Sequence, residues 1–202
     1  MERPTHMNTS WDSMRFEVCA HKYADLSEGN YGVSLLNDCK YGHDIHDGVM
    51  ILSLQKSPTD PYPDADQGQM TCVYSLMPHN GAFDAVKTSA EAYALNNPMI
   101  AMPATGESST LPERFDVLEC DRENILCEVV KEAEDSEETV LRLYEIAGAK
   151  TEAKIRLGFA AERVVLTDLL ENETEVLPVE DNAVKLTFSP FEIHTLRVRA
   201  AK

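Results

Sequence analysis

The densest group of chemically active side chains lies in the segment NDCKYGHDIHDG, residues 37–48. It holds three aspartates, two histidines, a cysteine, a lysine and a tyrosine within twelve positions. These side chains bind metal ions, or donate and accept the hydrogen bonds of a hydroxyl-rich ligand. The segment is therefore a candidate metal site, a candidate part of a sugar-binding cleft, or a polar turn.

A metal site in this segment would use His43 and His46, with Asp44 and Asp47 beside them. Histidines three positions apart share a face only on a helix, whereas glycines and strand-like runs flank this segment. A structural zinc site also needs four ordered ligands, and no second ligand cluster stands out elsewhere in the sequence. The segment is therefore predicted to be a polar hairpin turn, and we expect no metal in this chain.

The other histidines suggest no catalytic centre. His79 is predicted to cap a strand-to-helix turn, His194 to lie on a C-terminal strand, and His21 to lie at a strand end. The sequence contains no GxSxG, no glycine-rich phosphate loop and no HExxH. Nothing in the sequence pairs a nucleophile with a base.

The elements around these residues are mostly short strands with period-two alternation. In VKLTF, Val184, Leu186 and Phe188 are predicted to face inward, and Lys185 and Thr187 outward. Similar runs, separated by turn-forming residues, recur along the chain. They include MRFEVCA, YGVSLLN, VMILSLQ, MTCVYSLM, ILCEVVK, TVLRLYE, AKIRLGF and IHTLRVR. This pattern predicts an all-β fold built of antiparallel sandwiches.

Two segments depart from the strand pattern. Apolar residues at three- and four-residue steps predict one helix over about 82–95. The stretch MPATGESSTLPER, 102–114, has the composition of a linker. We therefore expect two domains, residues 1–105 and 106–202. The acidic run KEAEDSEET is predicted to be an exposed hairpin end.

Composition excludes some classes of partner. The formal net charge of the 202 residues is −17, and the acidic residues are spread along the chain. Such a polyanion repels nucleic acid and anionic membranes, so we expect neither as a partner. No apolar run is long enough to span a bilayer, and the N-terminus lacks the hydrophobic segment of a secretory signal. We expect a cytoplasmic protein whose five cysteines are buried free thiols.

The long segment from FEVCAHKYADLSEGNYGVSLLNDCKYG to CVYSLMPH resembles the C-terminal region of family 38 glycoside hydrolases, the α-mannosidases. The bacterial and cytosolic-type branch is the most similar. AYALNNP, ENILCEVVKEAEDSEETVLRLYE, DLLE and FSPFEIHTLRVR continue the resemblance to the end of the chain. At the start of the second half of the 37–48 segment, the family's usual sequence looks like GYDIKGN. His43 and His46 therefore lie outside the family's pattern.

The resemblance implies a large β-sandwich, of which residues 1–105 form a part, followed by a smaller sandwich. It also implies that the parent enzyme is a retaining α-mannosidase whose zinc and catalytic carboxylates lie in a separate N-terminal barrel. None of the family's catalytic motifs occurs in this chain. We therefore expect no catalytic residue, no metal ligand and no activity in the 202 residues alone.

The first candidate binding group is the set Asn37, Asp38, Lys40 and Tyr41, projected from a predicted rigid sheet. The second is a proline-rich loop that contributes Asp64, Asp66 and Gln67. In animal lysosomal and Golgi members, the similar region looks like DDxRG and lies near the catalytic cleft; Gln67 stands where the arginine would be. These loops are either the rim of a mannosidase cleft or ordinary capped turns.

Two roles remain open for the whole chain. It is either a non-catalytic β module that buttresses an α-mannosidase barrel and binds a mannose-containing oligosaccharide at the cleft rim, or a free-standing, lectin-like β-sandwich. Trp11 is the sole tryptophan, and lectin sites favour exposed aromatic faces. The expected partner is the catalytic part of the same enzyme. We also expect homo-oligomers, because a cut sheet exposes an unpaired edge.

Overall fold

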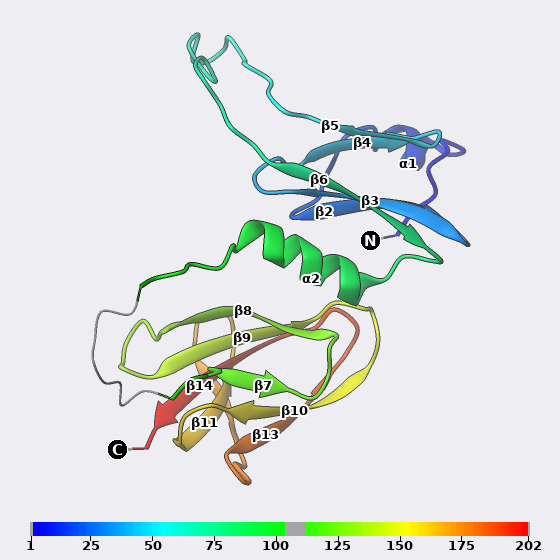
Figure 1. The fold of residues 1–202 in the computed structure, drawn as a ribbon. Helices are drawn as coiled ribbons and strands as arrows, with labels where there is room; N and C mark the ends of the chain where they lie inside the picture. Colours follow the sequence, from blue (N-terminus) through cyan, green and yellow to red (C-terminus); the bar gives the residue numbers. More distant parts are fainter. Residues whose placement is uncertain (1, 104–111, 202) are drawn as a thin grey trace. The chain divides into compact units, whose positions relative to one another are not determined.

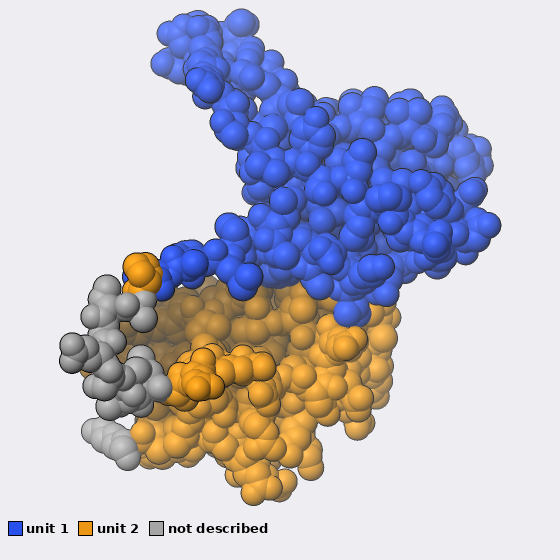
Figure 2. All heavy atoms as spheres, in the orientation of Figure 1, with its two compact units in different colours: residues 1–102 blue, residues 103–202 orange. Residues whose placement is uncertain are grey.

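The computed structural model describes residues 2–103 and 112–201, which divide into two compact units, 1–102 and 103–202. Figure 2 distinguishes the units by colour. The predicted domain boundary near 105, and most of the predicted linker, lie outside the described residues. No helix in the described ranges is long and apolar enough to cross a membrane.

Unit 1 contains two three-stranded antiparallel sheets and two helices (Figure 1). Its elements are α1 (Ser10–Ser13), β1 (Val18–Cys19), β2 (Tyr23–Glu28), β3 (Tyr31–Asn37), β4 (Gly42–His46), β5 (Val49–Leu52), β6 (Tyr74–Asn80) and α2 (Ala85–Asn96). The sheet orders are β1-β4-β5 and β2-β3-β6. The predicted helix over about 82–95 is confirmed as α2, and the short α1 was not predicted.

Helix α2 begins where Asp84 caps it and lies against the β2-β3-β6 sheet. The Asp84 carboxylate accepts hydrogen bonds from the backbone N–H groups of Val86 and Lys87, which satisfies donors that a helix start leaves open. Hydroxyl groups join helix and sheet: Ser34 lies 3.4 Å from Thr88, and Tyr23 lies 3.3 Å from Ser89. This interface therefore combines hydroxyl contacts with the buried Ala92.

Unit 2 is a β-sandwich of a three-stranded and a five-stranded antiparallel sheet. Its strands are β7 (Leu118–Cys120), β8 (Ile125–Glu132), β9 (Thr139–Glu145), β10 (Thr151–Leu157), β11 (Ala161–Thr167), β12 (Glu173–Leu177), β13 (Ala183–Phe188) and β14 (Ile193–Ala200). The sheet orders are β13-β10-β7 and β12-β11-β14-β9-β8. The predicted antiparallel sandwich is confirmed.

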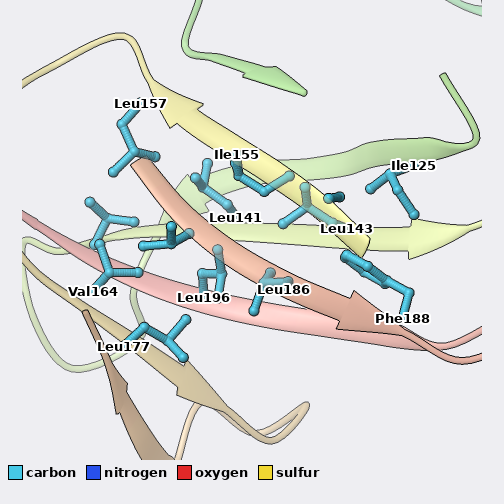
Figure 3. Packing of buried hydrophobic residues seen from close by; sticks show 13 residues of the cluster. Ile125, Leu141, Leu143, Ile155, Leu157, Val164, Leu177, Leu186, Phe188 and Leu196 are labelled. Atoms are coloured by element: carbon cyan, nitrogen blue, oxygen red, sulfur yellow. The ribbon is translucent and has the colours of Figure 1, made fainter. Parts of the chain in front are cut away.

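The core of unit 2 is a continuous apolar cluster supplied by both sheets (Figure 3). Val184, Leu186 and Phe188 of β13 are buried, while Lys185 and Thr187 are exposed, as the alternation predicted. They pack with residues such as Leu141 and Leu196 of the facing sheet. Alternation thus places one face of each strand in a shared interior.

The hairpin end of the acidic run lies between β8 and β9, as predicted, but one of its carboxylates is buried. Glu138 is only 7% exposed and lies 2.9 Å from both Arg197 and Arg199 of β14. The pairing offsets part of the cost of removing water from these charges. The composition of the acidic run predicted the hairpin end but did not indicate that Glu138 pairs with arginines near the end of the chain.

Two predictions about unit 1 were wrong. His79 does not cap a strand-to-helix turn; it lies within β6 and binds Asp25 of β2 at 2.9 Å. Gly32 leaves room for this imidazole, because a Cβ there would lie 2.5 Å from its ring atoms. The cysteines are not uniformly buried either: Cys19 and Cys39 are exposed. Both features depend on which strands become neighbours, which local alternation does not specify.

Candidate functional site

The first candidate group lies where β3 ends. Asn37 is fully buried, and its Oδ1 accepts a hydrogen bond of 2.9 Å from the backbone N–H of Lys40. Its carbonyl accepts another, of 3.0 Å, from the side chain of Asn96 in α2. Asparagine favours turns because its side chain can bond backbone in this way. The geometry makes Asn37 the anchor of the turn rather than an exposed contact.

Asp38 and Lys40 join this turn to the segment that leads into β6. The Asp38 N–H donates to the Val73 carbonyl at 3.1 Å, and the Val73 N–H donates to Asp38 Oδ1 at 3.0 Å. Hydrogen bonds from the Cys39 thiol and from the Val73 N–H hold the pKa of Asp38 below its usual range, so the carboxylate is ionised at neutral pH. The Lys40 ammonium lies 2.7 Å from Met70 Sδ, a weak acceptor that leaves its charge in place.

Tyr41 adds an aromatic surface beside these charges. Its side chain is 45% exposed, and its ring lies 4.5 Å from that of His21, which is also exposed. Its backbone carbonyl accepts from the Ala20 N–H at 2.9 Å, which fixes the residue against the start of unit 1. A carboxylate, an ammonium and a partly exposed ring thus share one turn, a combination suited to a polar ligand with apolar faces.

The second half of the segment is a strand, which corrects the prediction of one polar turn over 37–48. Residues 42–46 form β4, which pairs with both β1 and β5. Asp47 and Gly48, both with positive φ, form the two-residue turn to β5. Asp-Gly between apolar runs is a hairpin signal, and it could have placed this turn from the sequence.

His43 and His46 do not converge on a metal. Burial lowers the pKa of His43, whose Nδ1 lies 3.1 Å from the Tyr41 carbonyl and whose Nε2 has no partner among the described residues. His46 is on the other face of β4, 3.5 Å from Asp44. Within residues 2–103 and 112–201, no three His, Cys, Asp or Glu side chains are placed to hold a metal ion.

Asp64, Asp66 and Gln67 lie on the segment between β5 and β6, which Figure 1 shows extending away from the sheets. Their hydrogen bonds close this segment on itself. The Gln67 amide donates to the Pro63 carbonyl at 3.1 Å and to Asp64 at 3.3 Å, and Asp66 accepts from the Ser57 N–H at 3.2 Å. Asp66 adopts positive φ, which aspartate tolerates better than most residues.

The structure therefore brings together one candidate group but not both. Asp38, Lys40 and Tyr41 share the turn after β3, whereas the hydrogen bonds of Asp64, Asp66 and Gln67 stay within residues 55–67. Met70 lies beside Lys40, and Cys72 lies near enough to affect the pKa of Cys39, although no local pattern in the sequence indicated either. Their places follow from the pairing of β3 with β6, which are far apart along the chain.

Comparison with known proteins places these units in a family. The model "Glycosyl hydrolases family 38 C-terminal domain" matches residues 1–65, and "Glycosyl hydrolases family 38 C-terminal beta sandwich domain" matches residues 124–196. The chain belongs to glycosyl hydrolase family 38. It corresponds to the C-terminal region of that family, which confirms the resemblance found in the sequence.

Relatives in this family are named as α-mannosidases. Alpha-mannosidase 2C1 of Homo sapiens is 42% identical over 202 residues, covering 97% of this chain and 19% of the relative. The alpha-mannosidase of Saccharomyces cerevisiae is 33% identical over 222 residues, covering 98% and 20%. The chain thus spans about a fifth of the length of these curated relatives.

Solved structures agree on the fold. A crystal structure of an alpha-mannosidase from Enterococcus faecalis V583 matches with a TM-score of 0.75 at 22% identity. The match covers 98% of this chain and 23% of that one. A second family 38 protein from Enterococcus faecalis matches with a TM-score of 0.71 at 19% identity, covering 91% of this chain and 22% of that one.

Proposed function

We propose that this chain is a non-catalytic β region of a zinc-dependent, retaining α-mannosidase, that it buttresses the catalytic barrel, and that its turn after β3 contributes to the rim of the substrate cleft. The substrate class is a mannose-containing oligosaccharide, and the compartment is the cytoplasm. The main partner is the catalytic part of the same enzyme. Names of the relatives support the enzyme class, and the surface of unit 1 supports the buttressing role.

The observation that carries the proposal is the two-sided apolar character of β5. In VMIL, Met50 and Leu52 are half-buried, while Val49 and Ile51 on the opposite face are 51% and 46% exposed. A continuous apolar run is typical of a strand covered on both faces. Unit 1 covers only one, so the second face is suited to pack against another part of the enzyme.

The edges of the unit 1 sheets support the same conclusion. β5 and β6 are edge strands of their sheets. Tyr74 and Leu76 lie on one face of β6 and are 57% and 64% exposed. An edge strand with exposed apolar side chains invites pairing or covering. A second copy of the chain could cover it, as the predicted homo-oligomer requires, but the rest of a five-fold longer enzyme offers much more surface.

The zinc of the proposed enzyme does not fit the described residues. They contain no cluster of three potential ligands, and the partnerless His43 Nε2 is buried in unit 1 away from the other candidate ligands of β4, Asp44 and His46. Zinc would supply electrophilic stabilisation of substrate hydroxyls where it is bound. We assign that site to the catalytic part of the enzyme, and no step of hydrolysis to this chain.

The experiment is an activity assay with a mannose-binding assay on the same sample. The purified chain, supplied with zinc, should not hydrolyse an aryl α-mannoside, because transition-state stabilisation requires the missing nucleophile. A Cys19→Ser variant serves as a purification control, since a trace host mannosidase would remain in both preparations. Turnover that a substitution within this chain abolishes would overturn the proposal.

Mannose binding by the isolated chain separates the two roles that the sequence left open. A rim turn that works only together with the barrel should bind free mannose too weakly to detect at millimolar sugar. Saturable binding that Tyr41→Ala removes would instead support the lectin-like module. Tyr41 is the appropriate test residue because its ring is the exposed aromatic surface of the turn.

A further inference from the structure

Two cysteines far apart in sequence lie opposite one another beyond the ends of β3 and β6. These strands pair in one continuous antiparallel register, from Tyr31 with Asn80 to Asn37 with Tyr74. The ladder ends there, but Asp38 and Val73 stay side by side: the Asp38 N–H donates to the Val73 carbonyl at 3.1 Å, and the Val73 N–H donates to the Asp38 carboxylate at 3.0 Å. One step further, the same register would align Cys39 with Cys72, and the two thiols lie close enough for Cys72 to affect the pKa of Cys39.

Contacts on the far side of the cysteines keep the two segments together. The chain bends through Asp38 and Cys39, yet the Lys40 ammonium still reaches Met70 Sδ at 2.7 Å. The two cysteines are therefore bracketed by contacts before and after them. Cys39 is exposed and Cys72 half-buried, so small reagents can reach the pair.

The position of the pair in the ladder suits a disulfide. A backbone hydrogen bond joins Asp38 to Val73, so Cys39 and Cys72 follow directly after a paired position. In a regular ladder, opposed residues have Cα atoms about 4.5–5.5 Å apart. Disulfides span Cα separations of about 4.4–6.8 Å. The Asp38 carboxylate raises the pKa of Cys39, to which the neighbouring Cys72 thiol also contributes, and this favours the thiol form at rest.

We propose that Cys39 and Cys72 form a reversible disulfide with a low-molecular-weight disulfide, such as oxidised glutathione, as the oxidant. One cysteine thiolate attacks the oxidant, forming a mixed disulfide and releasing one glutathione thiolate. The second cysteine thiolate then attacks the protein sulfur and releases the other. Two protein thiols become one disulfide, and the oxidant takes up the two electrons and two protons.

The disulfide would close a loop that contains β4, β5 and the extended segment with Asp64 and Asp66. It would tie that loop at the turn that carries Asp38, Lys40 and Tyr41. In a reducing compartment such a bond is transient and responds to the redox state. The inference is independent of the proposed function, because it rests on the pairing of β3 with β6 and on the contacts just beyond it.

Peptide mapping tests the proposal directly, because trypsin places the five cysteines in five different peptides. The folded chain is equilibrated with reduced and oxidised glutathione, its free thiols are alkylated, and it is digested without reductant. Peptide 23–40 should be found linked to peptide 57–87, in about tenfold or greater excess over any other linked pair, since more distant pairs cannot close. Oxidation in concentrated guanidinium chloride gives the distribution expected without strand pairing.

Serine variants provide the matched control. Cys39→Ser and Cys72→Ser should each abolish the linked peptide, whereas Cys19→Ser, which changes another exposed cysteine of unit 1, should leave its yield unchanged. Equal yields of all cysteine pairs, a native distribution like that in denaturant, or separate glutathione adducts on Cys39 and Cys72 would overturn the proposal.

Discussion

The two units use similar strand patterns but differ in how they bury them. Of the described apolar residues, seventeen are buried in unit 2 and only four, Ala24, Leu35, Leu36 and Ala92, in unit 1. Within residues 2–103 and 112–201, eighteen of the 25 exposed large apolar side chains belong to unit 1. Two facing sheets give unit 2 a shared interior, while the interior of unit 1 includes Ser34, Thr88 and Ser89.

The difference shows that unit 2 has the larger apolar core, and it supports the proposal that unit 1 is covered by another part of the enzyme. Burial of apolar area contributes about 25 cal/mol per Å², so a unit with four buried apolar residues gains little from its own core. Its strands nevertheless have the apolar composition of covered strands. The following predictions start from this contrast, with the largest expected effect first.

Truncation of a phenylalanine side chain should show the largest difference in stability effect between the two units. Phe188 is fully buried in unit 2, whereas Phe16 in unit 1 is 56% exposed. Phe188→Ala should lower the free energy of unfolding of unit 2 by about 3–5 kcal/mol, through lost burial and the cavity left behind. Phe16→Ala in the isolated chain should change the free energy of unfolding of unit 1 by less than about 0.5 kcal/mol. Urea titrations followed by circular dichroism measure both, and similar losses would contradict the contrast.

A buried carboxylate makes the stability of unit 2 sensitive to acid. Glu145 is fully buried; burial acts to raise its pKa, but hydrogen bonds from Phe191, Asn124, Ala147 and Gly148 together hold it below its ordinary value of about 4.5. A lowered folded-state pKa stabilises the fold above about pH 4.5, and this contribution is lost as pH falls through the folded-state value.

Glu145→Gln should therefore cost about 2–3 kcal/mol at neutral pH, because an amide N–H₂ would face backbone donors. The stability of the variant should also depend less on pH below about 4.5. Glu162→Gln, at an exposed position of β11, is the matched control and should behave as the unaltered chain. If the stability of Glu145→Gln falls below about pH 4.5 as steeply as that of the unaltered chain, Glu145 does not have this role.

The candidate rim turn should matter for catalysis more than for folding. Made in the full-length enzyme, Asp38→Ala or Lys40→Ala should each lower kcat/KM by roughly tenfold or more. Loss of a charge-assisted hydrogen bond of about 1.5–3 kcal/mol has this effect. The melting temperature should stay nearly constant in Lys40→Ala and fall slightly in Asp38→Ala, which also loses the hydrogen bond from the Val73 N–H. Loss of stability with unaltered kinetics in the folded fraction would make the turn structural only.

The smallest expected effect concerns the reactivity of Cys39. Asp38→Asn keeps an oxygen for the Val73 N–H but removes the carboxylate charge that raises the pKa of Cys39. The thiolate population at neutral pH should rise, and alkylation by iodoacetamide should become severalfold faster. Cys19 in the same sample supplies an internal control. A slower reaction at Cys39 would show that Asp38 acts through another route.

Local patterns predicted the elements whose contacts lie nearby in sequence or follow one alternation. β13, α2 and the hairpin end of the acidic run belong to this group, as does the resemblance to the family. Patterns failed where distant strands meet. Nothing near His79 indicates Asp25 as its partner, and nothing near Cys39 indicates Cys72, because both pairs depend on the order β2-β3-β6.

The candidate site shows the same limit. Residue types in the turn after β3 suggested polar recognition, but β4 was mistaken for part of the turn because its polar residues concealed its alternation. Asn37 was predicted to be a ligand-binding residue, but it is buried and its side chain bonds the backbone of Lys40. A sequence specifies which groups are present; only the folded neighbourhood decides which of them remain available to a ligand.

Hydrogen exchange, compared between this chain alone and the full-length enzyme, tests most directly whether unit 1 needs another part of the enzyme to cover it. Amides of β5 and β6 should exchange much more slowly in the full-length protein, because its additional surface covers these edge strands. Amides of β9 and β14, central in the five-stranded sheet, should exchange alike in both. Equal protection of β5 and β6 in the two proteins would contradict the account.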